Sequence, residues 1–134
     1  MMRKILAILL ALVLTLGCAS AFAELTFTTG GTSGTYYAFG GVLAQYITDH
    51  SDVAVTAVAG EGSAANIDML DMGFAQLGFV QSDVAYYAYN GINFEQYEGN
   101  PINSFTALAA LYNETVQLVT SDPAIKSMED LRGK

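Results

Sequence analysis

Three short β-rich runs alternate with three helical patterns in this chain, and that alternation constrains its fold more than any other feature. The six segments follow one another as 25–29, 36–50, 53–59, 64–72, 76–80 and 83–89. A helix between two strands returns the chain so that the strands run parallel. The sequence therefore predicts an α/β fold, with a mostly parallel sheet and helices on both faces. Two further apolar runs, 105–112 and 114–120, predict additional strands.

The helical segments carry recognisable start and stop signals. The expected N-cap residues are Ser33 or Thr35, Ser63 and Ser82. Gly73 and Gly91 are expected to end the second and third helices. Gly40 and Gly41 lower the helix propensity of the first helix, so we expect them where it packs closely on the sheet.

The loops that leave the carboxyl ends of the three strands form a candidate ligand site. They cover 30–35, 60–63 and 81–83, and each carries small or polar residues just before a helix. In open α/β sheets, ligands bind beyond the carboxyl ends of the strands. Glycines let backbone approach a ligand closely, while hydroxyls and first-turn N–H groups supply donors for an anion. The alternative is that the first loop is only a tight turn between strand and helix.

Tyrosines lie at or just after two of these loops. The set is Tyr36, Tyr37, Tyr86, Tyr87 and Tyr89. Tyrosine offers an apolar wall with a polar tip, which suits a ligand cleft. We expect Tyr36 and Tyr86, nearest the loops, to face a ligand and the other three to pack against the fold.

The sequence contains no evident catalytic, metal or cofactor pattern. His50 is the only histidine and ends a helix, which favours a solvated role near the dipole's negative pole. Asp68 and Asp71 share one helix face, as on a solvated surface. The segment 60–65 matches a dinucleotide pattern nominally, but it follows the second strand and would place Glu61 beside a pyrophosphate. We therefore expect no enzyme, no cofactor and no metal.

The first 23 residues have the pattern of a secretory signal peptide. Arg3 and Lys4 form a basic start, 5–16 is an apolar run too short to span a membrane, and 21–23 gives an A-x-A cleavage site. The alternative is a lipoprotein in which Cys18 carries the lipid. In both cases we expect an extracytoplasmic protein, in the periplasm or at the cell surface.

Cleavage after Ala23 would leave an acidic chain without cysteine. Lys126, Arg132 and Lys134 would stand against 13 acidic residues, a net charge near −10. That charge argues against nucleic acid and against an anionic membrane surface as partners. It does not exclude an anionic ligand, because backbone N–H groups outweigh the net charge inside a cleft.

Several blocks cover nearly all of the chain after residue 23: TGGTSGTYY at 29–37, the helical block 40–47, VAVTAVAGEGSAAN at 53–66, LGFVQSDVAYYAYNG at 77–91, the run 108–112 and IKSMEDLRGK at 125–134. In this order, they resemble the TAXI family, the extracytoplasmic substrate-binding proteins of TRAP transporters.

The resemblance implies a two-lobed periplasmic-binding-protein fold of the type II class, with the ligand held between lobes that close on it. It implies a small organic acid or an amino acid such as glutamate as ligand, and a TRAP-type membrane permease as the partner that receives it. The residues that it places at the cleft are Gly31, Thr32, Ser33, Gly34, Tyr36, Ser63, Asn66, Gln81, Asp83 and Tyr86.

The length departs from that family pattern. Two lobes need roughly 100–150 residues each, and about 111 residues follow position 23. We therefore expect 24–113 to form the first ligand-binding lobe, and 114–134 to hold a crossover strand and the start of a second lobe in a truncated chain. The hypothesis is an extracytoplasmic solute-binding protein or its N-terminal part. Two alternatives use the same scaffold: an exported enzyme and a periplasmic ligand-sensing module.

Overall fold

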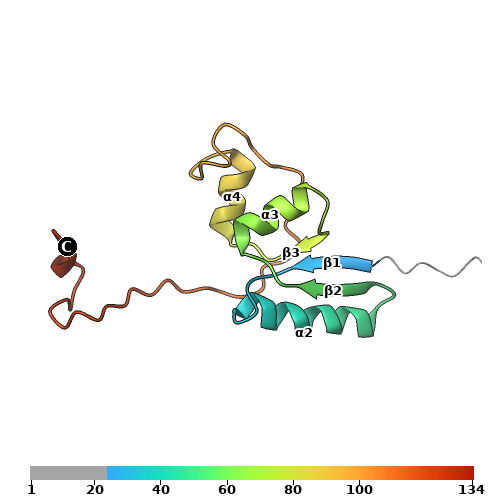
Figure 1. Cartoon of the computed structure of the whole chain (residues 1–134), viewed down its shortest axis with the longest axis horizontal. Coiled ribbons are helices and arrows are strands. Elements are labelled where there is room, and N and C mark those ends of the chain that lie inside the picture. The colour runs from blue at the N-terminus through green and yellow to red at the C-terminus, as the bar shows by residue number, and fades with distance from the viewer. Residues whose placement is uncertain (1–23) are drawn as a thin grey trace, which may run out of the picture.

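The centre of the molecule is a parallel three-stranded sheet, seen in a computed structural model that describes residues 24–134. The strands are β1 (Glu24–Thr28), β2 (Ala54–Val58) and β3 (Leu77–Gly78). They lie in the order β2-β1-β3, with Glu24 paired to Ala54 and Phe27 to Leu77 (Figure 1). The predicted signal peptide and the alternative lipidation site Cys18 lie outside the described residues.

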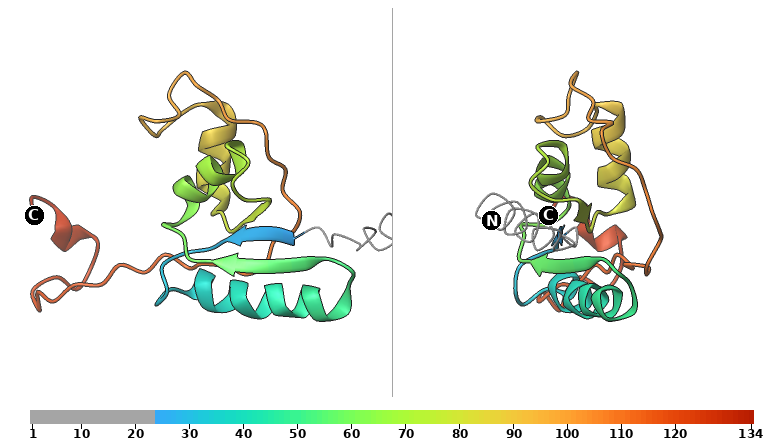
Figure 2. Two further views of the ribbon diagram at one scale, coloured as in Figure 1. Left: turned by 45° about the vertical axis from the view of Figure 1, so that its right-hand side comes forward. Right: turned by 90° about the vertical axis from the view of Figure 1, so that its right-hand side faces the viewer.

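Helices cover both faces of this sheet, as the alternation of segments predicts. They are α2 (Thr35–His50), α3 (Ser63–Asp71) and α4 (Ser82–Asn90). Figure 2 shows α2 on one face and α3 with α4 on the other. The α/β fold with a parallel sheet and two covered faces is therefore confirmed.

Each face has its own apolar core. On the α2 face, the buried residues are Phe27, Ala44, Val55 and Phe79. On the α3 and α4 face, they are Ile67, Val84, Ala88 and Tyr97. Successive strand residues point to opposite faces, so β1 sends Phe27 into the first core and Thr28 towards α3.

The element boundaries follow the predictions closely, except in the third strand. The predicted run 76–80 is a strand only at Leu77–Gly78. Its pairing extends further, because the Gln76 N–H donates to the Thr26 carbonyl (3.0 Å) and the Phe79 N–H to the Thr28 carbonyl (3.1 Å). Gly73 and Gly91 have φ of 74° and 67° just after α3 and α4, which confirms them as the residues that end these helices.

The predicted strands at 105–112 and 114–120 are wrong. These residues have no regular structure, and no backbone hydrogen bond joins them to the sheet in the described part of the chain. Val116 and Val119 are 95% and 85% exposed. An apolar, β-branched run becomes a strand only where a neighbouring strand pairs with its backbone. The first part of this region stays on the α/β body, where Phe105 packs against the second core and Tyr112 against Phe39, and only the chain beyond Glu114 runs away from the body (Figures 1 and 2).

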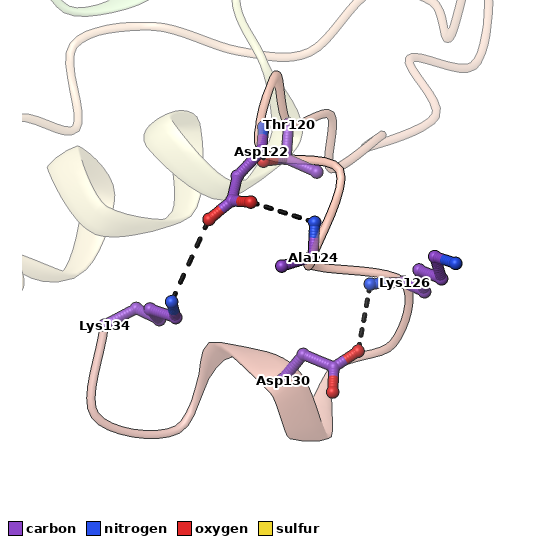
Figure 3. A network of polar contacts seen from close by, with 6 residues as sticks. All are labelled: Thr120, Asp122, Ala124, Lys126, Asp130 and Lys134. Carbon is purple, nitrogen blue, oxygen red and sulfur yellow. Dashed lines mark hydrogen bonds and ion pairs between the residues drawn. The ribbon is translucent and has the colours of Figure 1, made fainter.

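Residues 120–134 form a short segment held by local polar contacts, with one 3-10 turn, η1 (Glu129–Leu131). The Asp122 carboxylate accepts the Ala124 N–H (2.9 Å) and lies 3.9 Å from the Lys134 ammonium (Figure 3). The Asp130 carboxylate accepts the N–H groups of Lys126 and Ser127, both at 2.9 Å. The hydrogen bond from Lys126 and those from Ser127 hold the pKa of Asp130 below its ordinary value. The regular structure after residue 90 is thus limited, in the described part of the chain, to one short turn.

Between residues 24 and 134, none of the helices has both the length and the apolar content that crossing a membrane requires.

We predict opposite effects for alanine at the two neighbouring glycines of α2. A Cβ at Gly40 would lie 2.5 Å from Thr29 Cγ2 and 3.1 Å from Phe79 Cε2, whereas one at Gly41 meets nothing within 4 Å. Gly40→Ala should lower the free energy of unfolding by about 1–3 kcal/mol through overpacking. Gly41→Ala should raise it by about 0.5–1 kcal/mol through helix propensity.

Urea unfolding of the two variants beside the unsubstituted protein measures both effects. Equal changes in the two variants would contradict the close packing of α2 on the sheet at Gly40.

Candidate functional site

One pocket of about 270 Å³ lies where the three strands end at their carboxyl edge. It is open to solvent and takes residues from each of the three predicted loops. Its lining residues are Gly30, Gly34, Thr35, Tyr36, Gly62, Ser63, Gln81 and Glu114. The sheet order explains this convergence, because parallel strands deliver their following loops to the same edge.

The pocket is surrounded by the starts of all three helices. The N-cap residues of α2, α3 and α4 are Gly34, Gly62 and Gln81, and all three line the pocket. None of these helices has a side-chain cap hydrogen bond. The first-turn N–H groups of a helix lack an intrahelical partner and carry the positive end of its dipole. At α4 the Asp83 carboxylate accepts one of these donors, the Val84 N–H, so the free backbone donors lie chiefly at the starts of α2 and α3.

The predicted N-caps Ser33 or Thr35, Ser63 and Ser82 are wrong, and Ser63 shows why. Its Oγ accepts a hydrogen bond from the Gln81 N–H at 3.0 Å, and the side chain is 8% exposed. The hydroxyl thus ties the loop after β2 to the loop after β3 instead of capping its own helix. Because its oxygen accepts from Gln81, the hydroxyl can still donate its proton within the pocket, where it also interacts with Tyr36.

Asn66 has a structural role that the sequence does not reveal. It is fully buried, at 0% exposure, and does not line the pocket. Its Oδ1 accepts from the Thr28 hydroxyl (2.7 Å), and its Nδ2 donates to the carbonyls of Thr29 (2.6 Å) and Phe79 (2.8 Å). The amide therefore braces the ends of β1 and β3 against α3, beneath the pocket.

The other predicted site residues divide into two groups. Gly34, Tyr36, Ser63 and Gln81 line the pocket, and the ring of Tyr36 stacks on Phe79 with centroids 4.9 Å apart. The remaining residues are exposed and do not line it: Gly31, Thr32, Ser33, Asp83 and Tyr86. Asp83 accepts the Val84 N–H at 2.8 Å, so its carboxylate is held at the start of α4.

Glu114 is a pocket residue that sequence reasoning missed. Its Oε2 accepts a hydrogen bond from Gln81 Nε2 (3.0 Å), and its Oε1 accepts one from the Tyr112 hydroxyl (3.3 Å). The Tyr112 ring in turn lies against Phe39, with centroids 5.7 Å apart. No local pattern marks Glu114 as a site residue, because it begins an apolar run that predicts a strand.

Two tyrosines, Tyr36 in the pocket and Tyr112 beside Glu114, have raised pKa values. Burial raises the pKa of Tyr36, the Ser63 hydroxyl opposes that shift, and the negative charges of Glu114 and Asp83 add to it. Partial burial, together with the charge and hydrogen bonding of Glu114, raises the pKa of Tyr112 to about 12. Both hydroxyls are therefore neutral donors at any physiological pH.

The model of the NMT1-like family matches residues 27–134. The match begins within β1 and takes in the three loops of the pocket and Glu114. The family is of the periplasmic-binding-protein type, which agrees with the parallel sheet and the position of the pocket at its carboxyl edge.

We predict that Asn66→Ala is strongly destabilising. The substitution leaves the Thr28 hydroxyl and the carbonyls of Thr29 and Phe79 without their buried partner. Buried groups that lose their hydrogen bonds should lower the free energy of unfolding by about 2–4 kcal/mol. The matched control is Asn90→Ala, which removes one exposed bond to the Tyr86 carbonyl and should cost under about 0.5 kcal/mol. Similar denaturation midpoints for the two variants would contradict the stabilising role of the Asn66 hydrogen bonds.

We also predict that Tyr112 loses its proton at an unusually high pH. Its pKa is raised from 10.0 to about 12 in the folded state, so its contribution to stability is complete below about pH 10 and is lost as the pH rises through about 12. When tyrosinate absorbance is followed as the pH rises, the component with a midpoint near pH 12 should be missing in Tyr112→Phe. In Glu114→Gln that component should move to lower pH, because the nearby negative charge is gone. A titration unchanged in both variants would contradict the contact between Tyr112 and Glu114.

Proposed function

The chain belongs to the NMT1-like family, and from that premise we propose that its pocket captures a small organic acid or an amino acid such as glutamate for a membrane permease. The family is one of extracytoplasmic solute-binding proteins, whose members bind a small molecule and are usually not enzymes. The ligand class and the permease are the proposal.

The convergence of three uncapped helix starts on one pocket carries this proposal. Gly34, Gly62 and Gln81 each stand at the N-cap of a different helix and each line the same cavity. Free first-turn N–H groups bind carboxylate oxygens without requiring a cationic side chain. At about 270 Å³ the cavity is slightly below the range of about 300–1,000 Å³ usual for ligand pockets. That volume suits a small solute better than a dinucleotide.

The permease in this proposal is of the TRAP type, and the protein is a TAXI-type binding protein. The sequence blocks at 29–37, 53–66 and 77–91 support it, since they contain every pocket residue except Glu114. An export signal at 1–23, or a lipid on Cys18, would bring the protein to the same extracytoplasmic compartment.

The proposal extends to the domain organisation of the chain. Residues 24–113 are one ligand-binding lobe, and 114–134 lead towards a second lobe that would close on the pocket. The exposure of the apolar side chains Val116 (95%), Val119 (85%) and Leu118 (67%) supports this, because a packing partner would bury them.

No observation favours the alternative of an exported enzyme. His50 lies at the opposite end of α2 from the pocket, where it is exposed and stacks on Tyr46 with centroids 4.1 Å apart. Within residues 24–134, no group of three histidine, cysteine or acidic side chains could hold a metal ion.

We predict that L-glutamate or a small dicarboxylate raises the melting temperature of the protein. Binding to the folded state alone stabilises it by about 2.7 kcal/mol at a hundredfold excess over Kd. For a domain of this size that is a rise of roughly 10 °C.

The matched pair Ser63→Ala and Ser33→Ala tests the pocket itself. Ser63 lines the pocket and Ser33 does not, so only Ser63→Ala should reduce the shift measured against each variant's own ligand-free melting temperature. The absence of any shift with glutamate, succinate or other small acids would contradict the proposed ligand class.

A further inference from the structure

We propose that Glu114 is a specificity-determining residue, and that it makes the pocket select ligands carrying an ammonium group. The inference rests on the proposed function, because it concerns the same pocket. It narrows the ligand class from organic acids in general to amino acids and related zwitterions.

Glu114 is held with its charge at the pocket wall. The Gln81 amide donates to Oε2 at 3.0 Å and the Tyr112 hydroxyl donates to Oε1 at 3.3 Å. The Tyr36 hydroxyl also interacts with this carboxylate. A carboxylate has about four lone-pair sites, so these three partners hold it in place and still leave acceptor capacity for a ligand.

The Gln81 side chain adds a second acceptor of known orientation. Because an ionised carboxylate only accepts hydrogen bonds, the amide nitrogen of Gln81 must be the atom that faces Glu114. Its Oε1 is then left as an acceptor on the same pocket-lining residue. Two side chains from different segments thus offer oxygen acceptors at one wall.

The charges of the pocket favour a positive group at this wall. The lysine and arginine side chains of residues 24–134 are Lys126, Arg132 and Lys134, and none of them lines the pocket. Asp83 adds a second negative charge close enough to act on Tyr36. A ligand ammonium next to Glu114 would form charge-assisted hydrogen bonds with it, whereas a neutral or negative ligand group at the same position would lack them or be repelled by the carboxylate.

The pocket therefore combines two chemically different sets of groups. The Ser63 hydroxyl and the uncapped helix starts at Gly34 and Gly62 supply donors. The Glu114 carboxylate and the side-chain amide oxygen of Gln81 supply acceptors. An amino acid presents a carboxylate and an ammonium on one carbon, and it can satisfy both sides at once.

The experiment compares L-glutamate with 2-oxoglutarate, which share a carbon skeleton and differ in the ammonium-bearing carbon. Calorimetric affinities should favour L-glutamate at least tenfold in the unsubstituted protein. In Glu114→Gln, which keeps the size of the side chain and removes its charge, that ratio should fall at least tenfold. Most of the fall should come from weaker binding of L-glutamate, with 2-oxoglutarate bound equally or more tightly.

Glu61→Gln is the matched control for a general charge effect. Glu61 lies in the loop after β2, is exposed and does not line the pocket, so its removal changes the net charge equally. The ligand ratio should stay within twofold of the unsubstituted protein. An equal change in Glu61→Gln and Glu114→Gln would overturn a specific role for Glu114.

The remaining outcomes separate this inference from the proposed function. If the unsubstituted protein binds both ligands and Glu114→Gln leaves their ratio unchanged, the inference fails and the proposed function stands. If it binds 2-oxoglutarate more tightly than L-glutamate, the inference also fails alone. If it binds neither these ligands nor any other small acid or amino acid, both fail.

Discussion

The buried amide of Asn66 is the interaction on which the edge of the sheet depends. It joins the end of β1, through Thr28 and Thr29, to the end of β3 at Phe79. Gly60 lies against the same amide, since a Cβ there would come within 2.7 Å of Asn66 Oδ1. All three strand ends are therefore organised around one side chain. Such a network stabilises only when every member is paired, and among the described residues no buried side-chain polar atom lacks a partner.

This brace explains why the site forms where it does. With the strand ends fixed, the loops after β2 and β3 come close enough for the Gln81 N–H to reach the Ser63 hydroxyl. The helices begin at Gly34, Gly62 and Gln81, none of which has a side-chain cap hydrogen bond. Their first turns give up that local stabilisation and leave backbone donors free, chiefly at α2 and α3. The hydrogen bond between Ser63 and Gln81 therefore both joins the two loops and sets the positions of two pocket-lining residues.

The pocket also shows how little net charge says about a binding site. The chain has a net charge of −8, yet the cavity combines backbone and hydroxyl donors with the carboxylate of Glu114. Each side is set by orientation over a few ångströms, where dipoles and single charges outweigh distant ones. Glu114 reaches this wall from a segment that contributes nothing to the sheet, and Tyr112 steadies it by packing against Phe39 and donating to its carboxylate.

The sequence by itself determined the order of strands and helices, the parallel sheet, the covered faces and the three loops of the pocket. These features follow from local periodicity and from the connection rules of parallel strands, which act over short stretches of chain. Only the tertiary structure decided the roles of individual residues. Asn66 is buried and holds the strand ends together, and the Ser63 hydroxyl accepts a hydrogen bond from the loop after β3. Residues 105–120 pair with no strand, and Glu114 lines the pocket. Each of these outcomes depends on partners 13 or more residues away, as in the 13 residues between Asn66 and Phe79 and the 33 between Gln81 and Glu114. No local pattern in the sequence encodes such a distance.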